Sequence, residues 1–336
     1  MTTSRSPLLD RLAASGSFGF GASSLGNLYH TLPDETARAT VDAAWSQGVR
    51  YFDTAPFYGF GLSERRLGDA LRERDRDDFI LSTKVGRVLV PGVAADDRYG
   101  FQSPMPFDPI FDYSYDGVMR SVEASLHRLG LARIDILYMH DLGRVTHGAE
   151  HDRHMADAIG GFRAMTELRE QRVVEAIGLG VNEIEICAES IERVDLDILM
   201  IAGRYTLLNQ GAGAFFETCR QRGIGIVGAG VFNSGILATG SRSGSAHYDY
   251  GPAPADILRR VAALEEYCAR FSIPLAAAAL QFVSNHPAVT ALVVGTGNPS
   301  RILETAELAR LPIPASFWSA LRAEGLIDQG GQTLLA

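Results

Sequence analysis

Runs of apolar residues alternate with amphipathic stretches along the whole chain. The apolar runs are nearly continuous, which is typical of strands buried on both faces in a parallel sheet. We expect strands at residues 18–21, 49–53, 79–84, 134–140, 174–179, 196–201, 225–228 and 292–295. Helical patterns separate them, at residues 33–47, 63–74, 115–129, 155–171, 183–193, 212–222, 255–285 (two helices) and 300–308.

Eight strand–helix repeats predict an α/β fold, and at this length they favour a closed (β/α)8 TIM barrel over an open doubly wound sheet. Signals at the helix ends agree, with Asp34 expected as an N-cap and Gly48, Gly130 and Gly223 as helix ends. No GxGxxG fingerprint of a Rossmann domain follows the first strand. Because no linker or change of composition divides the chain, we expect residues 1–336 to form a single domain.

Two long segments interrupt the regular pattern, residues 86–114 after the third strand and residues 239–254 after the seventh. Both are expected to lie over the C-terminal mouth of the barrel, where long loops usually bind ligands or close over them. The first is rich in aromatic residues and proline, and the second in glycine, serine and tyrosine. A plain surface excursion fits the second segment better than the first.

Composition excludes several classes of protein. The chain is 46% hydrophobic and 21% charged, which excludes an acid-rich disordered chain. Its net charge of −9 argues against a nucleic-acid partner. No apolar run reaches the roughly 20 residues of a membrane span, and the first ten residues lack the apolar core of a signal peptide. Three cysteines without a CxxC pair argue against a disulfide framework or a zinc site, so we expect no metal and a cytoplasmic location.

One feature of the composition points to chemistry. Lys84 is the only lysine among 31 basic residues. Survival of one lysine by chance is the simple explanation. The functional one is that an ammonium is compact and has a pKa that its surroundings can shift, which a guanidinium does not offer.

Polar residues follow the second, third and fourth apolar runs, where Asp53, Lys84 and His140 end their strands and Tyr58 lies in the loop after Asp53. Singly, each has an ordinary structural explanation, such as a helix cap or a hydrogen-bonded core histidine. In a barrel these strand ends converge on one pocket. An ammonium beside a phenol lowers the pKa of that phenol, and a neutral histidine can orient a substrate oxygen. Such a group of residues handles the proton of a carbonyl–alcohol pair, so a nicotinamide cofactor must carry the hydride.

The motifs Asp53-Thr-Ala-Pro-Phe-Tyr58-Gly, Ser-Thr-Lys84 and Met-His140-Asp141 resemble the aldo-keto reductase superfamily, and the resemblance runs from Gly19 to about Thr305. It implies a TIM barrel that binds NAD(P)H without a Rossmann domain. It also implies that Tyr58 is the general acid or base, that Lys84 tunes it, that Asp53 pairs with Lys84 and that His140 orients the substrate carbonyl.

The resemblance further implies a set of cofactor-binding residues. They are Gly21, Ser23, Asp53, Asn182, Tyr205, Val231, Phe232, Asn233, Gly235, Leu237, Gly295, Thr296, Gly297, Arg301, Glu304 and Thr305. The chain departs from the family pattern at Val181, Ala202 and Ala229, where a serine, a glutamine and an aromatic residue are usual. Gly295 stands where a lysine would meet a 2′-phosphate, which favours NAD, while the retained Arg301 leaves NADP as an alternative.

Within the superfamily, segments 18–27, 50–59, 202–206 and 232–237 look most like the D-threo-aldose (L-fucose) dehydrogenases, and the pyridoxal 4-dehydrogenases share much of this pattern. The expected reaction takes a hydride from a cyclic aldose hemiacetal and gives a lactone. The alternative substrate is pyridoxal, which would be oxidised to 4-pyridoxolactone. A non-catalytic nicotinamide-binding regulatory subunit and a Schiff-base aldolase that uses Lys84 are alternatives of other classes. The oligomeric state stays open.

Overall fold

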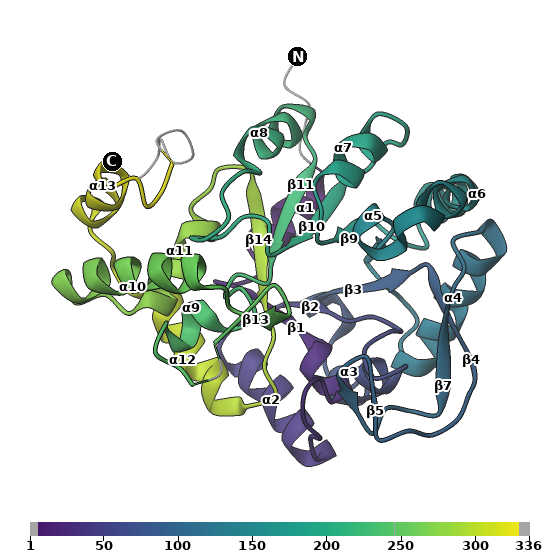
Figure 1. The fold of residues 1–336 in the computed structure, drawn as a ribbon. Coiled ribbons are helices and arrows are strands. Elements are labelled where there is room, and N and C mark those ends of the chain that lie inside the picture. Colours follow the sequence, from purple (N-terminus) through teal and green to yellow (C-terminus); the bar gives the residue numbers. More distant parts are fainter. Residues whose placement is uncertain (1–5, 245, 329–336) are drawn as a thin grey trace.

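Eight parallel strands close into a barrel in the computed structural model, which describes residues 6–244 and 246–328 (Figure 1). The order around the barrel is β1-β14-β11-β10-β9-β8-β3-β2, with β2 returning to β1. The barrel strands are β1 (Gly19–Gly21), β2 (Tyr51–Asp53), β3 (Ile80–Val85), β8 (Ile136–His140), β9 (Ala176–Val181), β10 (Ile198–Ala202), β11 (Gly225–Ala229) and β14 (Val289–Val294). The predicted (β/α)8 barrel is therefore confirmed.

Helices form the outer layer of the barrel (Figure 1). The longer ones are α2 (Asp34–Ser46), α3 (Leu62–Leu71), α4 (Tyr115–Leu129), α6 (His151–Glu170), α7 (Glu185–Ile191), α8 (Gly213–Arg222), α10 (Ala255–Arg270), α11 (Leu275–Ser284), α12 (Pro299–Arg310) and α13 (Ala315–Ala323). Shorter ones are η1 (Ala22–Gly26), η2 (Arg76–Asp78), α5 (Arg144–His147), η3 (Gly148–Glu150) and α9 (Ile236–Thr239). Gly130 and Gly223 end α4 and α8 in the left-handed conformation, as predicted.

Two predicted helix starts are wrong. The N-cap of α2 is Pro33, and Asp34 is its first helical residue. The Asp34 carboxylate accepts a hydrogen bond from Arg66 Nε at 2.7 Å, so it binds a side chain rather than the helix backbone. The helix expected from residue 155 begins at His151, because His151 and His154 are buried and extend its packed face.

An N-terminal helix that sequence reasoning missed, α1 (Pro7–Ala13), closes the N-terminal end of the barrel. Its three leucines, Leu8, Leu9 and Leu12, belong to the same buried cluster as side chains from inside the barrel. Leu9 packs against Gly225, the first residue of β11, so closely that a Cβ there would lie 2.7 Å from Leu9 Cδ2. Sequence reasoning missed this helix because polar residues surround its short apolar face.

Both long segments contain hairpins instead of open loops. Segment 86–114 holds β4 (Arg87–Pro91) paired with β7 (Phe107–Phe111), and β5 (Asp97–Arg98) paired with β6 (Phe101–Gln102). Figure 1 shows β4, β5 and β7 on the side of the barrel where α3 and α4 lie. Segment 239–254 holds β12 (His247–Tyr248) paired with β13 (Gly251–Pro252). Each segment follows the C-terminal end of a barrel strand, β3 for the first and β11 for the second.

Candidate active site

Three neighbouring strands, β2, β3 and β8, carry Asp53, Lys84 and His140 at or next to their C-terminal ends. Lys84 Nζ donates to Asp53 Oδ2 at 2.7 Å and to the carbonyl oxygen of Thr54 at 2.9 Å. Both Lys84 and Asp53 are 2% exposed. A charged pair at this depth is stable only when its hydrogen bonds are satisfied, and these bonds hold the ammonium at one position.

A second chain of hydrogen bonds holds the other oxygen of the Asp53 carboxylate. Ser82 Oγ donates to Asp53 Oδ1 at 2.7 Å, and the hydroxyl of Tyr51 lies 3.0 Å from Ser82 Oγ and 3.2 Å from the hydroxyl of Tyr138. All of these side chains are buried. The network uses both carboxylate oxygens, so Asp53 has one orientation.

Tyr58 lies on the turn after β2, with its ring centre 4.8 Å from Lys84 Nζ. Burial raises the pKa of the Tyr58 hydroxyl, Lys84 lowers it and Asp53 raises it, so that the pKa is above its ordinary value. The expectation that Lys84 brings this pKa below about 10 is therefore wrong for the protein alone, because desolvation outweighs the ammonium. Burial acts against the charge of Lys84, but Asp53 and Tyr58 raise the Lys84 pKa and keep it protonated.

His140 completes the group, with its ring centre 5.9 Å from that of Tyr58 and nearly perpendicular to it. His140 Nδ1 lies 3.0 Å from Arg87 Nη1, and Arg87 Nη2 donates to Asp141 Oδ2 at 2.9 Å. Burial lowers the pKa of His140 well below its ordinary range, Asp141 raises it, and Arg87 and Lys84 lower it further. The ring is therefore neutral at neutral pH.

Sequence reasoning missed Arg87. This arginine opens β4, three positions after Lys84, and its guanidinium lies over the rings of Phe57 at 4.1 Å and Phe111 at 4.6 Å. The sequence did contain one signal for Arg87, its position just beyond the end of β3, because residues there face the barrel mouth. Its partner His140 is 53 positions away in the chain.

The residues expected to bind the cofactor follow the other arc of the barrel. Apart from Asp53 on β2, they lie at or after the C-terminal ends of β1, β9, β10, β11 and β14, which are consecutive in the order β1-β14-β11-β10-β9. Gly21 ends β1 and Ser23 lies in η1. The segment 295–297 links β14 to α12, which carries the last three residues of the set, Arg301, Glu304 and Thr305.

This arc fits a dinucleotide. Gly21 and Gly295 approach so closely that a Cβ on Gly295 would lie 2.9 Å from the carbonyl oxygen of Gly21, and without side chains both present bare backbone to a ligand. In the loop after β11, Gly230, Asn233, Ser234 and Gly235 all have positive φ. Asn233 is buried, and its Oδ1 has no hydrogen-bond partner among the residues that the structure describes. A ligand amide or hydroxyl would satisfy it.

Some members of the predicted cofactor set face the core instead. Tyr205 stacks on Phe282 at 5.1 Å and packs against Phe216 at 5.0 Å. Val231 and Leu237 are buried in the main apolar core. These three side chains contribute packing, and Val231 and Leu237 could meet a ligand only through their backbone.

Aromatic side chains surround the mouth near Tyr58. Tyr29, Tyr99 and Tyr250 are 63%, 70% and 67% exposed, and all three have positive φ. Tyr99 packs against Phe57 with ring centres 5.7 Å apart. Burial raises the pKa of Tyr250 to about 12, and Tyr58 adds to the rise. We name these three exposed side chains, Tyr29, Tyr99 and Tyr250, the tyrosine rim.

The hairpin that carries Tyr250 is tied to the cofactor arc. Arg204 bonds to Asp249 with Nη1–Oδ1 at 3.0 Å and donates from Nε to the carbonyl oxygen of Asn182 at 2.5 Å. The backbone N–H of Tyr250 donates to Ser234 Oγ at 2.9 Å. These contacts fix the backbone of Tyr250 against the cofactor arc.

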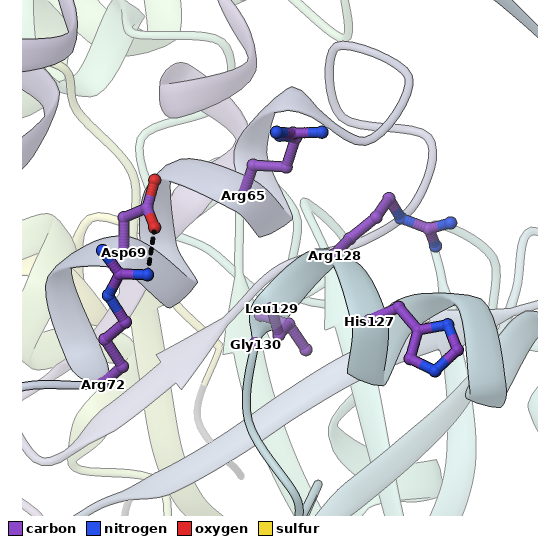
Figure 2. A pocket seen from close by; sticks show the side chains of 7 residues that line it. All are labelled: Arg65, Asp69, Arg72, His127, Arg128, Leu129 and Gly130. Carbon is purple, nitrogen blue, oxygen red and sulfur yellow. Dashed lines mark ion pairs between the residues drawn. The ribbon is translucent and has the colours of Figure 1, made fainter.

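Figure 2 shows a different hollow, of about 380 Å³, between α3 and α4 on the outside of the barrel. It is lined by Arg65, Asp69, Arg72, His127, Arg128, Leu129 and Gly130. Asp69 pairs with Arg72 at 3.2 Å, and Arg128 pairs with the buried Glu64 at 2.5 Å. The Arg128–Glu64 pair joins the two helices, whereas the Asp69–Arg72 pair lies at the end of α3. The hollow contains none of the four residues of the candidate site.

Among the described residues, no helix combines the length and the apolar character that crossing a membrane requires. The three cysteines are free and buried.

Comparison with known proteins agrees with this geometry. The model of the aldo/keto reductase family matches residues 17–324. The chain is 43% identical to a pyridoxal 4-dehydrogenase from Microbacterium luteolum and 40% identical to a D-threo-aldose 1-dehydrogenase from a Pseudomonas species. Each alignment covers 92% of this chain and 94% of the relative.

Among solved structures, the holo form of an aldo-keto reductase from Bacillus halodurans superposes with a TM-score of 0.71 at 23% identity, covering 95% of this chain and 94% of the other. That likeness supports the fold. The motifs at the strand ends, the extent of the family match and the two relatives at 40% identity or more lead to one conclusion. The chain belongs to the aldo/keto reductase family, whose members are oxidoreductases that use nicotinamide cofactors.

Proposed function

We propose that this protein is a dehydrogenase that oxidises a cyclic hemiacetal to a lactone, with a D-threo-aldose such as L-fucose as substrate and NAD as cofactor. The observation that carries the proposal is the buried Lys84–Asp53 pair, 2.7 Å apart, beside Tyr58 and the neutral His140. The relative at 40% identity is named for oxidation of this sugar class.

The side chains of the chain handle the proton and the substrate oxygen. Tyr58 accepts the proton of the anomeric hydroxyl, and the fixed ammonium of Lys84 stabilises the phenolate that does so. Asp53 holds Lys84 in place and charged. His140, neutral because it is buried near Arg87 and Lys84, hydrogen-bonds the substrate oxygen. When bound, the oxidised nicotinamide supplies the hydride acceptor.

The glycine-lined arc would hold the dinucleotide, with Asn233 for a polar group and the 295–297 segment near the start of α12 for a phosphate. NAD is favoured over NADP for two reasons. Gly295 supplies no cation for a 2′-phosphate, and Arg301 is already paired with Glu304 at 2.7 Å. Both effects weaken a charge-assisted contact of roughly 1.5–3 kcal/mol.

Pyridoxal is the second candidate substrate, because it too forms a cyclic hemiacetal that oxidation converts to a lactone. The relative at 43% identity is named for this reaction. The tyrosine rim also favours it, since exposed aromatic rings offer flat faces for stacking an aromatic substrate. The same chemistry at Tyr58 serves both substrates.

The test is reduction of NAD and NADP by the purified protein with L-fucose, D-arabinose and pyridoxal as separate substrates. We expect reduction of NAD by a hemiacetal, with a lower KM for NAD than for NADP. Tyr58→Phe should lower kcat by about 10²- to 10⁴-fold. Tyr115→Phe is the matched control, because its hydroxyl donates to Glu167 on the outer layer and should leave kcat unchanged.

Two results would overturn the proposal. Cofactor binding without turnover of any of these substrates would indicate the regulatory subunit. Trapping of Lys84 by borohydride with a carbonyl substrate would indicate the aldolase.

A further inference from the structure

We propose that Arg87 is a positioning residue that fixes the tautomer of His140, so that His140 presents Nε2–H to the substrate oxygen and does not serve as a base. The inference deepens the proposed function and rests on it for the identity of the oxygen that His140 meets. The tautomer itself is a property of the protein without substrate.

The tautomer follows from the donors and acceptors at one contact. Arg87 Nη1 lies 3.0 Å from His140 Nδ1. A guanidinium has five N–H donors and no acceptor, so the imidazole must accept at Nδ1. A neutral imidazole that accepts at Nδ1 carries its single proton on Nε2. His140 is therefore a hydrogen-bond donor on the side away from Arg87.

The guanidinium can impose this because it is held on several sides. Arg87 Nη2 donates to Asp141 Oδ2 at 2.9 Å, and the rings of Phe57 and Phe111 lie 4.1 and 4.6 Å from its central carbon. Its side chain is 8% exposed. Gly86 makes the preceding turn with φ +98°, where a Cβ would lie 2.4 Å from the ring of Tyr113. The backbone thus delivers Arg87 to one place.

The charges around His140 keep its ring neutral, which the contact requires. Asp141 favours the protonated ring, while burial, Arg87 and Lys84 oppose it, so that the pKa of His140 falls well below its ordinary range. The Tyr58 ring meets it edge-on. The Tyr113 hydroxyl contacts the backbone oxygen of His140 at 2.8 Å rather than its ring, and it also lies 3.0 Å from the carbonyl oxygen of Asp141 and 2.9 Å from His147 Nε2.

The outer nitrogen remains available to a substrate. His140 Nε2 lies 3.6 Å from Asp141 Oδ2, which is longer than a normal hydrogen bond. Because Arg87 occupies Nδ1 as a donor and Nε2 already carries a proton, His140 has no free lone pair for proton abstraction. Tyr58 is then the proton acceptor of the site.

The first experiment records ¹⁵N–¹H spectra of the histidine side chains in the full-length protein, with His140→Gln used to assign the His140 signals. We expect His140 to be a single neutral Nε2–H tautomer through neutral pH. An Nδ1–H tautomer or a protonated ring in the wild type would overturn the proposal, whether or not Arg87→Met folds.

The second experiment compares Arg87→Met with Arg98→Met. Arg98 lies in the same segment, pairs with Asp108 and covers the Phe60 ring at 4.9 Å, so this control removes an equivalent arginine that does not touch His140. In Arg87→Met, Asp141 remains beside His140, but the positive charge of Arg87, which disfavours protonation of the ring, is removed. The His140 signals should then show mixed tautomers or protonation, and kcat/KM should gain an acid limb toward the ordinary histidine pKa of about 6.5.

At neutral pH we expect kcat/KM of Arg87→Met to fall about tenfold, as for the loss of one hydrogen bond of about 1.4 kcal/mol. Arg87→Lys should restore part of it, because an ammonium is also a donor only. An Arg87→Met protein with wild-type His140 signals and no acid limb would contradict the proposal. Nε2–H signals in a protein that oxidises no hemiacetal would contradict the proposed function instead and leave the tautomer assignment standing.

Discussion

The ammonium of Lys84 occupies a space that a guanidinium would overfill. Its Nζ reaches both Asp53 and the Thr54 carbonyl oxygen, and its stem passes so close to Gly180 that a Cβ there would lie 3.3 Å from Lys84 Cε. An arginine has the same charge but is longer and planar. The unique lysine of the chain is thus explained by packing as well as by charge.

We predict that Lys84→Arg lowers kcat by at least about 10²-fold while the protein stays folded and binds cofactor. The guanidinium can keep a pair with Asp53 but cannot place its charge beside Tyr58. Steady-state kinetics give the loss, and near-ultraviolet circular dichroism with a cofactor-binding titration reports fold and binding. Near-normal kcat in a folded variant would show that charge alone suffices.

The pH profile of oxidation follows from Tyr58. Because burial raises the Tyr58 pKa above its ordinary value of about 10, little phenolate is present at neutral pH. We predict that kcat/KM for oxidation rises with pH through the alkaline range without a plateau below that value, and that carbonyl reduction is favoured at lower pH, where Tyr58 is protonated. A plateau already reached at neutral pH, or an unchanged profile in Tyr58→Phe, would argue against Tyr58 as the base.

At the scale of the elements, the two arcs of the barrel divide the work. The strands β2, β3 and β8, with the turn after β2, carry the four residues proposed for proton handling. The loops after β1, β9, β11 and β14 carry most of those proposed for cofactor binding. The turn of the β12–β13 hairpin is tied to the second arc through the Arg204–Asp249 pair and the backbone N–H of Tyr250. A substitution in one of these elements should therefore change a single kinetic property, such as the choice of cofactor or the KM for the substrate.

The loop after β14 should control cofactor choice. We predict that Gly295→Lys raises the kcat/KM ratio of NADP to NAD about tenfold over Gly295→Ala, the change that 1.4 kcal/mol represents. Both variants place a Cβ 2.9 Å from the Gly21 carbonyl oxygen, so their comparison isolates the charge from the crowding. Equal ratios in the two variants would mean that residue 295 does not meet the phosphate.

The hairpin should control substrate affinity. Asp249→Asn weakens the contact with Arg204 and loosens Tyr250, so KM for the substrate should rise about fivefold, in line with the 1 kcal/mol upper value of an exposed pair. We expect kcat to change little. Glu217→Gln, which weakens an exposed pair with Arg220 on α8, is the control and should leave KM unchanged. A wild-type KM in Asp249→Asn would show that the hairpin does not control substrate affinity.

At the scale of the whole molecule, packing that stabilises the fold and the residues proposed for activity lie at opposite ends of the barrel. The helix α1 buries its leucines at the N-terminal end, and the candidate site lies at the C-terminal end. Leu9→Ala should lower the free energy of unfolding by about 2–5 kcal/mol, because Leu9 is 1% exposed and packs on Gly225. Urea unfolding gives the loss, and KM and kcat below the transition should equal those of the wild type. A raised KM would show that the two ends are coupled.

The amino-acid sequence by itself determined the barrel and the meeting of the four site residues. Nearly continuous apolar runs specify parallel strands, and eight of them close on themselves. Once the strands are parallel, residues at their C-terminal ends must converge, so Asp53, Lys84 and His140 come together from local patterns alone. The family motifs carry the same information.

Only the tertiary structure decided the electrostatics of the site. The pKa of Tyr58 depends on how deeply folding buries it, and desolvation there outweighs the ammonium that the sequence places nearby. The contact between Arg87 and His140 joins residues 53 positions apart through a hairpin that has no clear periodic signal. The packing of α1 likewise depends on a barrel end that must exist before the helix has a surface to cover. Burial and contacts between distant segments are properties of the folded chain, which is why local patterns do not contain them.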